Sequence, residues 1–206
     1  MIKILPVSHV SKESLKKIDE EFNEFNPSIV ALELDPLRLK ALKEDKPADP
    51  DGIFLKILSK AQAYLGKKTG VIPGYEMVYA HDKALDEGRE VVFIDQDIRT
   101  TIYKINKVSR KEKVKAIFYL LIGLISSYRK NIEDIPDKNE IKEIEYYMEN
   151  KFPELSRILL EERNNIMAGY LKNLEMQNPD KDILAVVGAA HKPGIQSLLG
   201  SNQLKN

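Results

Sequence analysis

The stretch IKILPVSHVSKESLKKIDEEFNEFNPSIVALEL, residues 2–34, decides the fold class. Two continuously apolar, β-branched runs, Ile2–Val7 and residues 29–34, enclose a segment with helical spacing. Ser11 is a plausible N-cap for that helix, which we expect to reach Phe25 before Asn26 and Pro27 stop it. Strands that are apolar on both faces are typical of buried parallel sheets, so the stretch predicts a βαβ unit.

The rest of the chain continues this alternation. Residues 91–94 and 183–187 are two further apolar runs, and helical periodicity separates them. From about residue 104 to about residue 176 the pattern is helical throughout, with breaks near Pro136 and Pro153. We therefore expect one α/β domain over residues 1–206, with a mostly parallel sheet flanked by helices and a helical insertion before the last strand. That insertion is a candidate cap over a site.

Composition excludes several classes of protein. The 32 basic residues balance 32 acidic ones, which argues against a nucleic-acid partner. Cysteine is absent, so thiolate catalysis and cysteine-ligated metals are excluded. The N-terminus lacks the pattern of a signal peptide, and the most apolar stretch, residues 116–125, is shorter than the roughly 20 residues of a membrane span. We expect a cytoplasmic protein without a transmembrane segment, and residues 116–125 as a buried or partner-facing helix.

Polar residues follow each predicted strand at its carboxyl end. Ligands of open parallel sheets bind at that edge, which gives a topological test for a site. The side chains delivered there are Ser8, His9, Glu33, Asp35, Asp95, Asp97, Arg99 and His191. Imidazole and carboxylate together suit a divalent metal, and two histidines with one carboxylate leave a coordination position for water. The sequence therefore predicts a polar site at this edge, with metal-dependent chemistry as one use of it.

A predicted helix from Glu154 to about Glu175 adds two charged candidates. On a helical wheel, Glu162 falls in the middle of an apolar stripe and Arg163 flanks it; the stripe consists of Leu155, Leu159, Ile166 and Tyr170. A carboxylate on a buried face needs a partner. We expect Glu162 and Arg163 to pair and face the sheet, either beside the site or as a structural ion network.

Several candidates have ordinary explanations as well. Asp35 precedes Pro36 and is expected mainly as a helix N-cap. Glu76 lies in a first helical turn, where the helix dipole favours a carboxylate in any case. Arg38 is either an anion clamp or the partner of a carboxylate. His81 is assigned to packing, and Ser8 beside His9 is too little to define a catalytic triad.

Six stretches, in order along the chain, resemble the TraB/PrgY family, which is related to the TIKI proteases and the erythromycin esterase/ChaN-like superfamily. They are His9-Val10-Ser11, VALELDPLRLKAL (residues 30–42), PGYEM (73–77), IDQDIRTT (94–101), EERNNIMA (161–168) and VVGAAHKPGI (186–195). The resemblance implies a pair of Gly-x-x-His motifs whose histidines, with a glutamate, bind a divalent metal such as Mn, Co or Zn for hydrolysis. The second motif is intact and ends at His191, whereas the first has Pro6 in place of glycine before His9.

The leading hypothesis is a metal-dependent, peptidase-like hydrolase with His9, Glu33 and His191 at the metal. Glu76 or Glu162 would be the acid or base, and the remaining charged groups would orient ligands or stabilise negative charge; these are Arg38, Asp95, Asp97, Arg99 and Arg163. The resemblance also implies a peptide or other small substrate, and family members with a hydrophobic membrane region make membrane association an alternative to a purely cytoplasmic location. Two rivals remain open. One is a non-catalytic protein that binds a peptide or docks on a membrane partner, and the other is a homodimer formed through residues 116–125.

Overall fold

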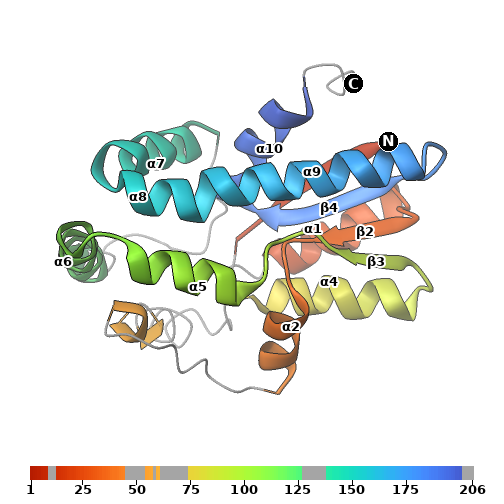
Figure 1. Ribbon diagram of the computed structural model, residues 1–206. Coiled ribbons are helices and arrows are strands. Elements are labelled where there is room, and N and C mark those ends of the chain that lie inside the picture. The colour runs from red at the N-terminus through yellow and green to blue at the C-terminus, as the bar shows by residue number, and fades with distance from the viewer. Residues whose placement is uncertain (9–12, 45–53, 58, 61–73, 127–137, 201–206) are drawn as a thin grey trace.

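A computed structural model describes residues 1–8, 13–44, 54–57, 59–60, 74–126 and 138–200 (Figure 1). The elements in chain order are β1 (Ile2–Val7), α1 (Glu13–Glu24), β2 (Ile29–Leu32), α2 (Pro36–Lys43), α4 (Tyr75–Asp86), β3 (Glu90–Phe93), α5 (Ile98–Lys107), α6 (Arg110–Ser126), α7 (Lys138–Lys151), α8 (Pro153–Ser156), a π-helical turn (Arg157–Glu161), α9 (Glu162–Gln177), β4 (Ile183–Gly188), a 3₁₀ turn (Ala189–His191) and α10 (Lys192–Leu199). His9, Ser11 and Pro136 lie outside the described residues.

The four strands form one parallel sheet in the order β1-β4-β2-β3. Ile29 of β2 is in register with Ile183 of β4 on one side and with Glu90 of β3 on the other. The predicted fold class, a parallel sheet flanked by helices, is confirmed. Strand boundaries differ from the prediction by one or two residues, since β2 ends at Leu32 rather than at Leu34.

Helices cover both faces of the sheet (Figure 1). On one face, Leu184 and Val186 of β4 belong to a core cluster with Phe22 of α1 and Met77 of α4. On the other face, Ala185 and Val187 belong to a cluster that includes Met167 and Leu171 of α9. Because both faces of the sheet are buried, successive residues of β4 enter the two core clusters in turn, which is why the strand sequence is apolar throughout rather than alternating.

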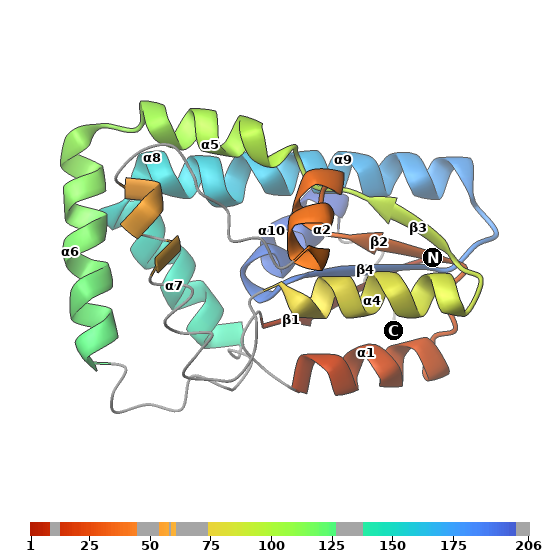
Figure 2. The ribbon, with the colours of Figure 1, turned by 90° about the horizontal axis from the view of Figure 1, so that it is seen from below.

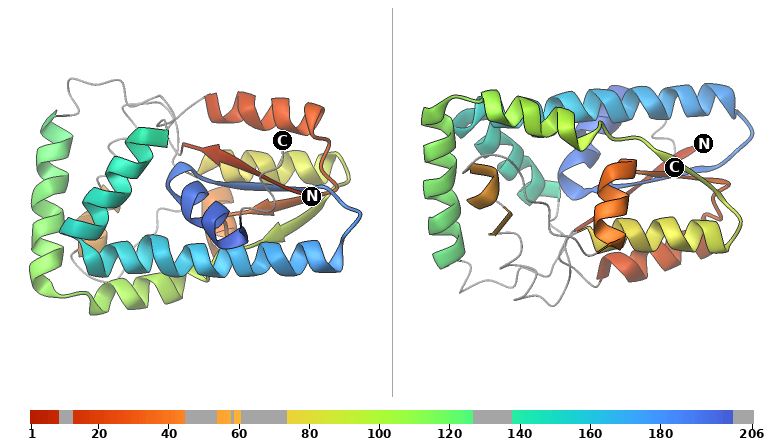
Figure 3. Two further views of the ribbon diagram at one scale, coloured as in Figure 1. Left: turned by 90° about the horizontal axis from the view of Figure 1, so that it is seen from above. Right: turned by 60° about the horizontal axis from the view of Figure 1, so that its bottom comes forward.

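The helices between β3 and β4 extend beyond the sheet. In Figures 2 and 3, α5, α6 and α7 surround the end of the molecule toward which the strand arrows point. They have a core cluster of their own, which includes Ile105, Phe152, Leu155 and Ile158. The carboxyl ends of the strands therefore lie between the helical layers and this helical region.

Residues 116–125 fall within α6, the longest helix of this region. Phe118 of this helix is 59% exposed and Val114 is 67% exposed, so the described part of α6 has apolar side chains on its surface. None of the helices in the described part of the chain is both long and apolar enough to span a bilayer. The predicted homodimer through this helix stays a prediction.

Candidate functional site at the carboxyl edge of the sheet

Glu33 is held at the junction of two central strands. It follows β2 directly, and its backbone N–H donates to the Val186 carbonyl oxygen of β4 at 3.0 Å. The Gly188 N–H, at the end of β4, donates to Glu33 Oε2 at 2.6 Å. Glu33 is 1% exposed, so this carboxylate is buried and its direction is determined by neighbouring backbone.

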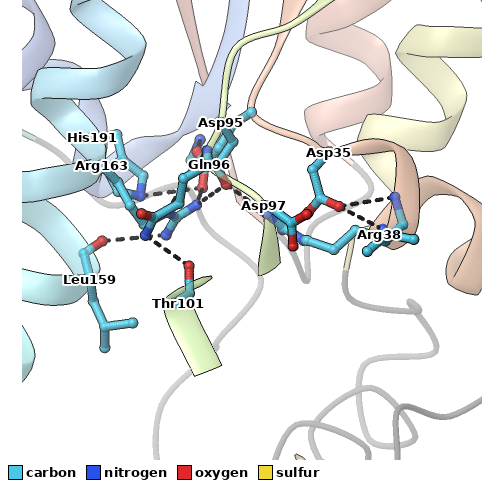
Figure 4. Close-up of polar contacts among 12 residues, drawn as sticks. Asp35, Arg38, Asp95, Gln96, Asp97, Thr101, Leu159, Arg163 and His191 are labelled. Carbon is cyan, nitrogen blue, oxygen red and sulfur yellow. Dashed lines mark hydrogen bonds and ion pairs between the residues drawn. The ribbon is translucent and has the colours of Figure 1, made fainter. Parts of the chain in front are cut away.

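Asp95 lies two residues beyond the end of β3, and the site's arginines converge on it (Figure 4). Its Oδ1 accepts hydrogen bonds from the Gln96 N–H at 2.8 Å and from Arg163 Nε at 3.0 Å. Its Oδ2 accepts from Arg163 Nη2 and from Arg38 Nη1, at 2.7 and 2.8 Å. Arg163 also donates from Nη2 to Glu33 Oε1 at 2.5 Å. Two buried carboxylates and two guanidinium groups thus form one network with balanced charge.

The charged groups of this network are largely buried. The side chains of Glu33 and Asp95 are each 2% exposed, and that of Arg163 is 13% exposed. Burial by itself would lower the pKa of the Arg163 guanidinium, but the negative charges of Glu33 and Asp95 outweigh it and raise the pKa above its ordinary value. Arg163 is therefore permanently charged.

Three strand-end residues serve local structure. Asp35 is the N-cap of α2 and accepts from the backbone N–H groups of Leu37 and Arg38, with Pro36 at the first helical position as predicted. Asp97 is the N-cap of α5, and its carboxylate pairs with Arg99, whose side chain is 77% exposed. The hydrogen bond from Arg99 lowers the pKa of the Asp97 carboxyl. Asp97 and Arg99 bind each other at the surface rather than joining the buried network.

The helical-wheel prediction for Glu162 is wrong. The π-helical turn at Arg157–Glu161 adds a residue to the helical repeat just before α9 and rotates everything after it. Glu162 consequently pairs with Lys104 and Arg157, while Arg163 turns to Glu33 and Asp95. The buried stripe of α9 consists of Asn164, Met167, Ala168 and Leu171. Tyr170, expected on the stripe, is 49% exposed.

His191 lies beside Glu33. It is 4% exposed, and its Nε2 is 3.2 Å from Glu33 Oε1. Its other ring nitrogen, Nδ1, is 2.7 Å from Oδ1 of Asn164, a buried residue of α9 that the sequence analysis missed. Counting helical steps backwards from the apolar residues Leu171 and Met167 would have reached Asn164. The structure therefore adds an amide to the predicted set of imidazole, carboxylate and guanidinium groups.

The last two candidates lie on α4. Glu76, in the first turn of this helix, is 2% exposed, and the N-terminus of α4 lies at the same end of the sheet as the network (Figure 2). His81, mid-helix, is buried; its ring stacks on Phe93 with centroids 6.0 Å apart, and its Nδ1 is 2.6 Å from Asp82 Oδ1. His81 is thus engaged within the packing of α4 on β3, as the sequence analysis expected.

His9, the second predicted imidazole, is outside the described residues. Ser8, just before it, is described, and its N–H and carbonyl oxygen both bond to the Ser14 hydroxyl, at 2.9 and 3.0 Å. Val7, the last residue of β1, is in register with Gly188, the residue that donates to Glu33. Among the described residues, no group of three or more His, Cys, Asp and Glu side chains is placed to hold a metal ion.

Comparison with known proteins gives a consistent result. Residues 4–205 match the profile of the TraB/PrgY/gumN family. An uncharacterized protein of Methanocaldococcus jannaschii is 32% identical over 94% of the chain, which covers 52% of that relative. TraB domain-containing proteins of Bos taurus and Mus musculus are 24% and 23% identical over 94% of the chain, which covers 61% of each. The chain therefore spans about half to three fifths of these relatives.

Proposed function

Because the chain belongs to the TraB/PrgY/gumN family, we propose that it is a divalent-metal-dependent hydrolase, peptidase-like, with its site at the carboxyl edge of the sheet. One observation carries the proposal. His191 Nε2 faces Glu33 Oε1 at 3.2 Å, while Nδ1 of the same ring contacts Asn164. An imidazole anchored through one nitrogen, with a carboxylate beside the other, is typical of metal-binding histidines.

These side chains fit a metal ion in chemistry and spacing. Ligand atoms that each lie about 2.0–2.2 Å from one ion are themselves about 3 Å apart, close to the distance between Nε2 and Oε1. Glu33 and His191 would hold the ion together with His9, which follows the end of β1. A bound divalent ion supplies Lewis-acid polarisation of a carbonyl group and lowers the pKa of water.

The chain's other charged groups have roles in this proposal. Arg38 and Arg163 would orient the substrate and stabilise negative charge that develops on it, and Asp95 would position both guanidinium groups. Glu76 is the candidate for proton transfer, since Glu162 pairs with Lys104 and Arg157 instead. Asp97 and Arg99, which are surface exposed, would contact the more distant parts of a peptide.

A second candidate function is peptide binding without turnover. The observation that favours it is the hydrogen bond from Arg163 Nη2 to Glu33 Oε1 at 2.5 Å, because this guanidinium already neutralises the oxygen that faces His191. In such a protein the same residues would bind a peptide's charged groups, and the site would need no metal.

The two functions are separated by measuring metal content and cleavage together. Purified wild-type protein is titrated calorimetrically with Mn²⁺, Co²⁺ and Zn²⁺, and a fluorogenic peptide library is incubated with each ion. The hydrolase proposal expects binding of one ion per chain and cleavage that requires it. Both properties should be lost in His191→Ala and Glu33→Gln.

Matched controls keep the result specific. His81→Gln replaces a histidine that stacks on Phe93, and Glu90→Gln replaces a carboxylate paired with Lys181 at the surface. Both variants should bind and cleave like wild type. A wild-type protein that neither binds these ions nor cleaves any peptide overturns the hydrolase. Peptide binding that survives combined His9→Ala and His191→Ala replacement supports the second function.

A further inference from the structure

Asn164 is an uncharged side chain in the buried charged site. It lies on the buried stripe of α9, where its neighbours Met167, Ala168 and Leu171 are packing residues, and it is 7% exposed. Its Oδ1 is 2.7 Å from His191 Nδ1. A polar side chain at a core position must have its hydrogen bonds satisfied, and this amide meets a ring nitrogen rather than backbone.

With the Asn164 amide oxygen facing the ring, the contact favours a proton on Nδ1. An amide oxygen can only accept a hydrogen bond, so Nδ1 must be the donor. In the neutral ring, Nε2 then carries the lone pair and is the atom that faces Glu33 Oε1 at 3.2 Å. The opposite arrangement would require the amide to turn its nitrogen toward the ring.

Gly194 explains how Asn164 can occupy this position. A Cβ atom at Gly194 would lie 2.2 Å from Asn164 Nδ2 and 2.9 Å from its Cγ. Gly194 is in α10 and does not have a positive φ, so the constraint on this position is space and not backbone conformation. His191 is the N-cap residue of α10, three residues before Gly194, so the start of this helix positions the imidazole and also leaves space for the Asn164 amide.

We propose that Asn164 is a positioning residue for His191, and that glycine at position 194 is required because any side chain there would displace the Asn164 amide. Asn164 fixes the orientation of the ring and keeps the proton on Nδ1. The predicted effect on metal affinity rests on the hydrolase function proposed above. The predicted orientation and tautomer of the His191 ring do not.

The decisive measurement is the tautomer of His191, read from long-range ¹H–¹⁵N spectra of metal-free protein at a pH where the ring is neutral. The chain has three histidines, so His9→Gln and His81→Gln assign the signals. Wild type should show a single tautomer protonated on Nδ1. Asn164→Ala should give a mixture or the Nε2-protonated form, and Asn164→Asp should restore the wild-type pattern because a carboxylate also accepts from Nδ1. Asn165→Ala, which removes the exposed neighbouring amide, is the control.

A double-mutant cycle tests the role of Gly194. Gly194→Ala alone should change the His191 spectrum as Asn164→Ala does, because the new methyl group displaces the amide. In the Asn164→Ala background the same change should have little further effect, since the clashing atoms are gone and the Asn164 Cβ would be 3.6 Å away. Denaturant unfolding of each variant separates a shifted tautomer from a misfolded chain.

Metal affinity provides the second readout, with Mn²⁺ or Co²⁺ alone as the probe. Asn164→Ala and Gly194→Ala should each weaken metal binding about 10- to 100-fold. The double variant should bind metal only slightly more weakly than either single variant. If wild type binds no metal, the hydrolase proposal fails while the tautomer still decides this inference. An Nε2-protonated ring in wild type, an unchanged ring in Asn164→Ala, or fully additive effects of the two substitutions would overturn it.

Discussion

Arg163 binds the carboxylate of Asp95 through two parallel hydrogen bonds, from Nε to Oδ1 at 3.0 Å and from Nη2 to Oδ2 at 2.7 Å. This geometry requires the planar fork of a guanidinium. It also joins α9 to the segment that follows β3, one of the two edge strands of the sheet. Since Arg163 Nη2 reaches Glu33 after β2 as well, one side chain connects two strand ends to the helix that covers them.

Replacing Arg163 should destabilise the fold. Arg163→Met leaves Glu33 and Asp95 as buried charges without their main partner, which should lower the free energy of unfolding by about 3–5 kcal/mol. Arg163→Lys should cost less, because it keeps the charge and loses the paired geometry. Urea unfolding measures both. Arg99→Met, at an exposed position, should unfold like wild type; equal losses at the two positions would contradict the importance of the buried network.

Glu112 of α6 should be needed to start α8. Its Oε1 accepts from the Leu155 N–H at 2.7 Å and its Oε2 from the Glu154 N–H at 3.2 Å, where the N-cap residue Phe152 has an apolar side chain that cannot accept a hydrogen bond. Glu112→Ala should lower the free energy of unfolding by about 1–2 kcal/mol, the usual effect of losing an N-cap, and Glu112→Gln by less. Glu149→Ala, at an exposed site in α7, is the matched control for calorimetric unfolding.

The hydrogen bond from Tyr79 to Asp19 should stabilise the fold over a window of pH and lose its effect in both acid and base. The bond, 2.7 Å long, lowers the pKa of the Asp19 carboxyl and raises that of the Tyr79 hydroxyl. A lowered carboxyl pKa contributes stability above the ordinary Asp value of 3.8, and this is lost as the pH falls through the folded pKa. A raised Tyr pKa contributes stability below the ordinary value of 10.0, and this is lost as the pH rises through the folded pKa.

Tyr79→Phe should therefore reduce stability most between about pH 4 and pH 10. Asp19 is partly exposed, so the loss should be roughly 0.2–1 kcal/mol, the range of screened surface interactions. Unfolding in urea at several pH values measures it. Tyr170→Phe, at an exposed position of α9, should show no such window, and a Tyr79→Phe loss that persists unchanged at pH 2 would argue against the ionised Asp19 as the partner.

Two glycines with open space around them should respond in opposite directions to alanine. Gly169 lies inside α9, and a Cβ there would meet nothing within 4 Å, so Gly169→Ala should raise the free energy of unfolding by about 0.5–1 kcal/mol. Gly88 has the same free space but a φ of +69°, so Gly88→Ala should lower it by about 1–2 kcal/mol. Thermal unfolding measures both variants, and melting temperatures that shift in the same direction would contradict this explanation.

The sheet and its polar edge were predictable because the signals are local. Each strand is a short apolar run, and the residue after it is carried to the carboxyl edge whatever the rest of the chain does. Glu33 and Asp95 could be expected there for that reason, and Asp35 could be identified as a cap from the proline that follows it. Neither inference depends on which helix packs against these residues.

The partners of these residues were not predictable from spacing alone. A regular helical wheel assumes one uniform repeat, and the π-helical turn at Arg157–Glu161 breaks that repeat. The wheel therefore assigns Glu162 to the face toward the sheet, where the structure has Arg163 bound to Glu33 and Asn164 in contact with His191. A single added residue rotates every side chain after it, and no composition signal marks where it occurs.

By itself, the sequence of this protein determined a parallel α/β domain, the edge at which its charged groups gather and the family to which it belongs, because these follow from runs and motifs contiguous in the chain. Only the tertiary structure decided that Arg163 joins Glu33 to Asp95, that Asn164 holds His191, and that Gly194 leaves the room for it. Those contacts depend on the rotation of α9 and on its packing against β4 and α10, which are set by the shape of the whole core.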